Sequence, residues 1–118
     1  MTTLVRAVWL LSIAVVVFLS LDPNPGIETS FSYQDKVHHF LAYFWLAFLP
    51  YCSFQNKTGI LISVLAMFLL GVLIEILQLQ IAGRFFSFPD ILANGAGILV
   101  GAGFGSSTRS RIRKDKKR

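Results

Sequence analysis

The chain has 118 residues, of which 54% are hydrophobic and only 14% are charged, with a formal net charge of +5. A soluble domain typically carries about 25% charged residues, so the composition argues against a soluble protein and favours a single membrane domain. The lone cysteine, Cys52, excludes an intramolecular disulfide framework and a cysteine-rich metal site.

The first apolar segment covers residues 4–21. It is long enough to cross a bilayer as a helix, which takes roughly 17–25 residues. A secretory signal peptide is the alternative, because Arg6 precedes the apolar stretch. The segment ends in FLSLDPNPG, which lacks the small residues of a signal-peptidase site, so we expect a retained helix followed by a turn. Trp9 is expected at the membrane interface.

The second segment, residues 37–54, is preceded by polar and titratable residues in the stretch YQDKVHH. Asp35, His38, His39 and Ala42 follow each other at i, i+3, i+4 and i+7, which places them on one helix face. The second helix is therefore predicted to carry its titratable groups at its beginning.

The third segment, residues 59–82, has no charge in its first sixteen positions. Its polar residues Glu75 and Gln78 fall in the last two turns, on the same face as Gly71 and Ala82. Polar and small residues thus share the face that would pack against other helices.

The fourth segment, residues 89–105, begins with Asp90 and Asn94. Its glycines repeat at every fourth position, a doubled small-residue pattern that lets helix backbones approach closely in lipid. The pattern predicts packing against a neighbouring helix, and it also allows a homo-oligomer formed through Gly97, Gly101 and Gly105.

Basic residues are concentrated in residues 109–118, which hold seven of the eleven. Four spanning helices put both termini on one side, and placing that side in the cytoplasm gives nine basic residues inside against two outside, as expected because cytoplasmic loops carry the positive excess. Residues 1–108 would then form one four-helix transmembrane domain, followed by a basic cytoplasmic tail. No aromatic residue interleaves with these charges, so the tail is expected to contact membrane lipids and not nucleic acid.

The predicted topology brings polar residues of three helices to the extracytoplasmic side. An acidic side chain at the centre of a membrane helix costs about 2.5–3.5 kcal/mol, so Glu75 needs a partner or a proton. The polar cluster is either a functional site or a clamp that holds the helices in register. Nitrogen and oxygen ligands suit zinc, but adjacent histidines point about 100° apart on a helix, so no metal and no cofactor is predicted.

The residues also match a known pattern. Asp35-Lys36-x-x-His39-Phe40-x-x-Tyr43, then Glu75-x-x-Gln78, then Gly83-Arg84, Asp90, Asn94 and Gly97 resemble the VanZ-like family over about residues 5–105. The resemblance implies a small polytopic protein of the cell envelope. It also implies a link to resistance against teicoplanin-type glycopeptides or to processing of envelope lipids.

Two functions from different classes are consistent with this pattern. The first is a membrane enzyme or head-group binder that acts on a lipid-linked envelope substrate, with Asp35, His39, Glu75 and Asp90 as candidate catalytic groups. Its candidate substrate-binding residues are Lys36, Tyr43, Gln78, Arg84 and Asn94. The second is a non-catalytic scaffold or partner-binding subunit in which the cluster only locks the helices together.

Overall fold

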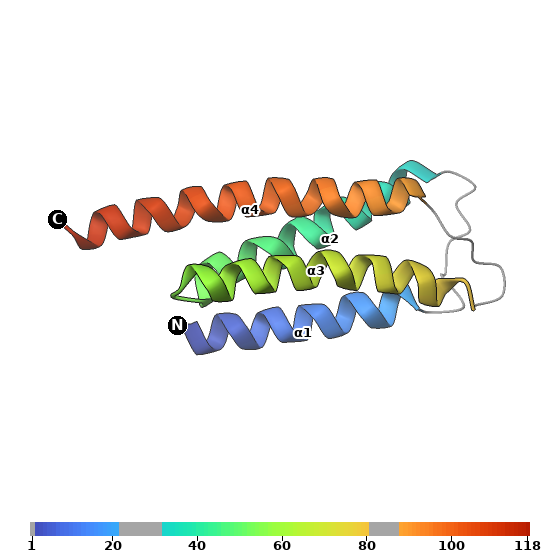
Figure 1. The fold of residues 1–118 in the computed structure, drawn as a ribbon, viewed down its shortest axis with the longest axis horizontal. Helices are drawn as coiled ribbons and strands as arrows, with labels where there is room; N and C mark the ends of the chain where they lie inside the picture. Colours follow the sequence, from blue (N-terminus) through green and yellow to red (C-terminus); the bar gives the residue numbers. More distant parts are fainter. Residues whose placement is uncertain (1, 22–31, 81–87) are drawn as a thin grey trace.

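The computed structural model describes residues 2–21, 32–80 and 88–118. Its regular elements there are four α-helices and no strand, which confirms the predicted all-α fold. The helices lie side by side, and the first residue of the first helix and the last residue of the fourth lie at the same end (Figure 1). They are α1 (Thr2–Ser20), α2 (Ser32–Ser53), α3 (Lys57–Gln78) and α4 (Phe88–Lys116).

All four helices begin one to five residues before their predicted bounds, and the largest differences are at the start of α2 and the end of α4. α2 begins at Ser32, so Asp35 and Lys36 belong to its first turns and do not precede it. α4 continues to Lys116, so most of the basic tail is the C-terminal part of this helix. Lysine and arginine are good helix formers, and cations in the last turn interact favourably with the negative end of the helix dipole.

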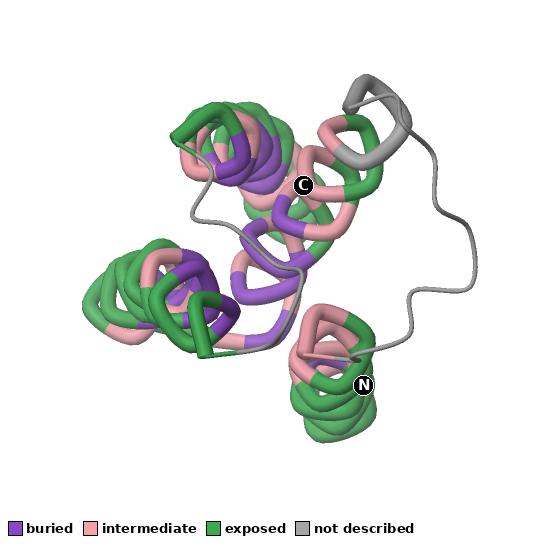
Figure 2. The backbone as a smooth tube through the Cα atoms, turned by 90° about the vertical axis from the view of Figure 1, so that its right-hand side faces the viewer, coloured by how far each residue is buried: buried purple, intermediate pink, exposed green. Residues whose placement is uncertain are grey.

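α2 is the central helix of the bundle. It contacts each of the other three helices, whereas no contact joins the described residues of α1 to those of α4. The end-on view in Figure 2 shows the buried sides of the helices turned inward around α2. The packing of the other helices on α2 therefore sets the positions of their polar side chains relative to one another.

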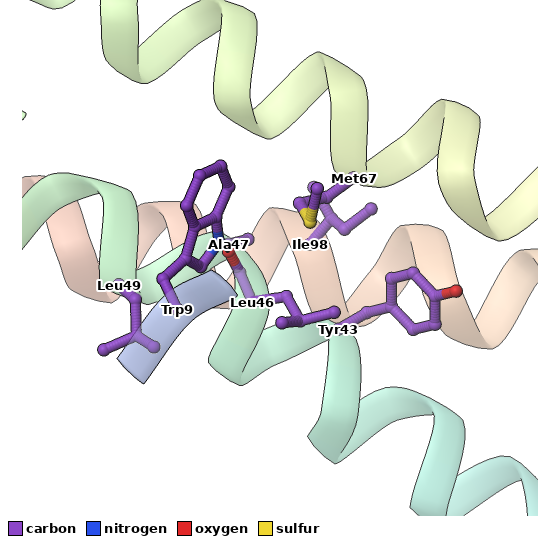
Figure 3. Packing of buried hydrophobic residues seen from close by; sticks show 7 residues of the cluster. All are labelled: Trp9, Tyr43, Leu46, Ala47, Leu49, Met67 and Ile98. Atoms are coloured by element: carbon purple, nitrogen blue, oxygen red, sulfur yellow. Dashed lines mark hydrogen bonds between the residues drawn. The ribbon is translucent and has the colours of Figure 1, made fainter. Parts of the chain in front are cut away.

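The apolar core includes Trp9, which is 9% exposed and packs inside the bundle, while its predicted depth at the membrane interface stays a prediction. Its indole Nε1 donates a hydrogen bond of 2.9 Å to the carbonyl oxygen of Leu46. Within a helix that carbonyl would accept from residue 50, but Pro50 has no N–H to donate. Trp9 of α1 thus supplies the donor that α2 lacks. The core cluster in Figure 3 comprises Trp9, Tyr43, Leu46, Ala47, Leu49, Met67 and Ile98.

The outer surface of the bundle is rich in large apolar side chains, such as Leu61, Leu65 and Leu69 along α3. Among the described residues, α1 and α3 are the two helices that are long and apolar enough to cross a membrane, with mean hydropathies of 2.2 and 2.8. The titratable residues of the polar cluster come from the other two helices and from α3: Lys36 and His39 lie on α2, Asp90 lies on α4, and Glu75 lies on α3.

The glycines of α4 pack against α2, as the small-residue pattern predicted. A Cβ atom at Gly97 would collide with the carbonyl oxygen of Phe40, and one at Gly101 with the carbonyl oxygen of Phe44. A Cβ at Gly105 would lie 2.6 Å from the Tyr51 ring. Because α2 covers these glycines within one chain, a homo-oligomer through them would need α2 to be displaced, and it stays a prediction.

Candidate functional site

Polar residues of three helices meet at the end of the bundle where α2 and α4 begin and α3 ends (Figure 1). They come together because the glycine stripe of α4 and Gly71 of α3 admit close packing on α2. Burial is nearly complete for Glu75, Gln78, Asp90 and Asn94, which are at most 8% exposed. The predicted convergence of these helices on one polar cluster is therefore present.

His39 has a defined orientation in the cluster. Its Nδ1 lies 2.9 Å from Oδ1 of Asn94. An amide oxygen only accepts, so Nδ1 carries the proton, and in the neutral ring the lone pair is on Nε2. That nitrogen faces Oδ2 of Asp90 at 3.9 Å. Asn94 therefore fixes the tautomer of His39 and directs its basic nitrogen toward a carboxylate.

Asp90 lies between two basic side chains of α2. In addition to His39, the ammonium of Lys36 lies 3.6 Å from its Oδ1. The Lys36 side chain is 28% exposed and that of Asp90 is 11% exposed, so Lys36 forms the open edge of the cluster. Both separations from Asp90 exceed the 2.7–3.2 Å of an N–H···O hydrogen bond. An oxygen atom of a water molecule or ligand beside these groups would have the basic side chains of Lys36 and His39 and the carboxylate of Asp90 as polar neighbours.

Tyr43 and Glu75 form the inner side of the cluster. Tyr43 is 2% exposed, and its hydroxyl points away from Trp9 and Met67 of the apolar core (Figure 3). The hydroxyl lies in the electrostatic field of the fully buried Glu75 carboxylate. A phenol next to a carboxylate can donate a hydrogen bond or relay a proton.

Gly71 makes room for this arrangement. A Cβ on it would lie 3.0 Å from the amide nitrogen of Asn94 and 3.2 Å from the Tyr43 ring. Sequence reasoning placed Gly71 on the polar face but did not identify this contact. The sequence signal for this contact was a residue without a side chain, Gly71, one helical turn before the acidic residue Glu75.

Three residues of the cluster could hold a metal ion. One ligating atom each of His39, Glu75 and Asp90 lies within 4.8 Å of the others. A nitrogen and two carboxylate oxygens are ligands that zinc and similar divalent ions accept. The sequence argument against a metal considered two adjacent histidines, whereas this group uses one histidine and carboxylates from two other helices. The ammonium of Lys36 already places a positive charge beside Asp90.

Other predicted residues have different outcomes. Gln78 donates from Nε2 to the carbonyl oxygen of Ser20 at 2.7 Å, so it ties α3 to the end of α1. His38 is exposed. Arg84 and the side chain of Asp35 lie outside the described residues. The catalytic and binding roles of all these residues stay predictions.

Comparison with known proteins gives one match. A family model described as VanZ/LLP1 matches residues 5–107, which is most of the chain and includes every residue of the cluster. The curated proteins and the solved structures contain no match.

Proposed function

The chain belongs to the VanZ/LLP1 family, and on this basis we propose that it is a multi-pass protein of the bacterial plasma membrane whose polar cluster binds the head group of an envelope lipid or lipid-linked substrate. In this proposal all four helices cross the membrane and both termini are cytoplasmic. The apolar α1 and α3 and the nine-to-two distribution of basic residues support it. The cluster then lies at the extracytoplasmic surface.

The observation that carries the proposal is the convergence of basic side chains on Asp90. Lys36 lies 3.6 Å and His39 lies 3.9 Å from its carboxylate oxygens. The Lys36 side chain is 28% exposed, so an anionic head group can reach its ammonium from outside the bundle. A charged group at an accessible edge of the cluster supports binding over a purely structural role.

The chemistry follows from the positions of the basic groups. Lys36 is at the open edge, where its ammonium can bind a phosphate or carboxylate of the substrate. His39 can accept a proton at Nε2 while Asn94 holds Nδ1, and the carboxylate of Asp90 would stabilise the imidazolium that forms. Asp35 and Arg84 are further predicted contributors, Arg84 as an anion-binding fork. Glycopeptide resistance of the teicoplanin type is the phenotype that the family suggests for this site.

A non-catalytic scaffold is the second candidate. It is favoured by the complete burial of Glu75 and by the backbone contact between Gly97 and Phe40, which leaves no cleft between α2 and α4 at that level. In that function the cluster would stabilise the bundle, and a partner protein would use another surface.

Conservative variants separate the two functions. His39→Asn keeps an N–H donor near the Nδ1 position but removes Nε2, and Asp90→Asn keeps the shape of the carboxylate. The exposed neighbour gives a matched control, His38→Asn. Abundance and melting temperature of the purified full-length protein are measured beside retention of envelope lipid by native mass spectrometry and glycopeptide susceptibility of the host.

A binding site predicts normal abundance and melting temperature with loss of lipid retention and of the phenotype in both cluster variants. A clamp predicts that stability and function fall together. Lipid retention and susceptibility that match those of the control variant, at normal stability, would refute the proposed function.

A further inference from the structure

A second concave site lies at the opposite end of the bundle, away from the polar cluster. It is a cavity of about 700 Å³ between the C-terminal part of α4, the end of α2 and the start of α3, next to the turn that joins α2 to α3. Figure 1 shows this part of α4 extending past that turn. The volume falls within the roughly 300–1,000 Å³ of small-molecule sites.

The wall formed by α4 is one helix face. Ser106, Arg109, Ser110, Arg113 and Lys117 line the cavity at the i, i+3, i+4, i+7 and i+11 positions of a helical stripe. Lys114 from the same helix and Lys57 from α3 add to the charge. The lining therefore has five basic side chains and no acidic one, although Asp115 is close in sequence.

Arg109 holds this wall in place. Its guanidinium donates to the carbonyl oxygens of Phe54, at 2.6 Å, and of Gln55, both in the turn that follows α2. Arg109 therefore satisfies two backbone acceptors of this turn and holds α4 against it. On the opposite wall Asn56 caps α3 by accepting from the backbone N–H of Gly59 at 2.7 Å.

The other four basic residues of the lining are exposed. The planar fork of Arg113 matches two phosphate oxygens, while the lysines add positive charge around them. The hydroxyls of Ser106 and Ser110 can donate further hydrogen bonds. Phosphate is the anion that this donor set fits.

An apolar side completes the cavity. Tyr51, Ile60 and Leu61 line it next to the cations, and Leu61 is 69% exposed. We propose that this cavity binds an anionic phospholipid, with the phosphate between Lys57 and Arg113 and the start of an acyl chain along Leu61. The cytoplasmic leaflet as the source of that lipid rests on the proposed topology, whereas binding itself does not.

The test uses full-length protein in a neutral detergent, titrated with short-chain phosphatidylglycerol, phosphatidylcholine or inorganic phosphate and followed by native mass spectrometry. The double variant Arg113→Gln with Lys117→Gln removes two cations of the lining. The matched control, Arg118→Gln with Lys116→Gln, removes the same charge from the same tail outside the lining.

A basic residue near an anionic lipid is worth about 1 kcal/mol, or about fivefold in affinity, so the lining variant should bind phosphatidylglycerol roughly 25-fold more weakly. The control should lose less than about threefold, because its charges are farther away and screened. Equal losses in both double variants would overturn the site in favour of diffuse tail charge.

The remaining arms test the ligand and the fold. Phosphatidylcholine should bind weakly, and tight binding of it would overturn the requirement for negative charge. Displacement of phosphatidylglycerol by an equal concentration of inorganic phosphate would overturn the lipid assignment. If the double variant loses its fold, Lys57→Gln on the opposite wall should still weaken binding about fivefold.

Discussion

The glycine contacts between α4 and α2 lead to the most direct prediction of stability. Gly97→Ala and Gly101→Ala each add one methyl group that faces the backbone of α2 and not a movable side chain. At Gly101 the new Cβ would lie 2.9 Å from the carbonyl carbon and 3.0 Å from the Cα of Phe44. Carbon atoms pack best at about 3.5–4.0 Å, so α4 would have to move away by roughly 0.5–1 Å.

The expected magnitude combines two opposite effects. Replacing a helical glycine by alanine favours the helix by about 0.5–1 kcal/mol. Overpacking a tight contact costs about 1–3 kcal/mol. Both variants should therefore be less stable than the parent by about 0.5–2 kcal/mol. Gly103→Ala is the control on the same helix, since a Cβ there has nothing within 4 Å, and it should be neutral or slightly stabilising.

The assay measures the apparent melting temperature of the detergent-purified full-length protein. Samples are heated to a series of temperatures, and the folded fraction that remains is measured by size-exclusion chromatography. A loss of 1 kcal/mol in a chain of this size should lower the melting temperature by about 4 °C or more. If Gly97→Ala, Gly101→Ala and Gly103→Ala all shift the melting temperature in the same direction, α4 does not pack on α2 through this stripe.

Three further predictions follow from the core, the topology and the cluster. Trp9→Phe should lower the free energy of unfolding by about 1–3 kcal/mol, because the carbonyl of Leu46 is left buried without a donor. Thermal melting checks this. Trp45→Phe removes an exposed hydrogen bond from the indole to the Ser12 hydroxyl and should cost less, so an equal loss would contradict the role of Trp9. A cytoplasmic reporter fused after Arg118 should be active and one inserted in residues 22–31 inactive, and the reverse pattern would invert the proposed membrane orientation. Zn²⁺ and EDTA should each leave the melting temperature unchanged, because the ammonium of Lys36 already offsets the charge of Asp90. Stabilisation by Zn²⁺ that His39→Asn abolishes would establish a metal site.

Local patterns in the sequence were enough to predict several features of the structure. Four long apolar segments with 3.6-residue periodicity predict four helices, since both length and period are properties of each segment alone. The same periodicity placed Glu75, Asp90 and Asn94 on the faces that are buried. The glycine spacing of α4 predicted its close packing, because only a residue without a side chain permits such an approach.

Contacts between segments far apart in the sequence were decided only by the tertiary structure. The indole of Trp9 satisfies a carbonyl that Pro50 leaves without a donor, and the amide nitrogen of Gln78 bonds the end of α1. Arg109 joins the C-terminal part of α4 to the turn after α2, through the carbonyl oxygens of Phe54 and Gln55. Periodicity tells which face of a helix is buried, but the partner of each polar atom depends on distances between helices, which no single segment determines.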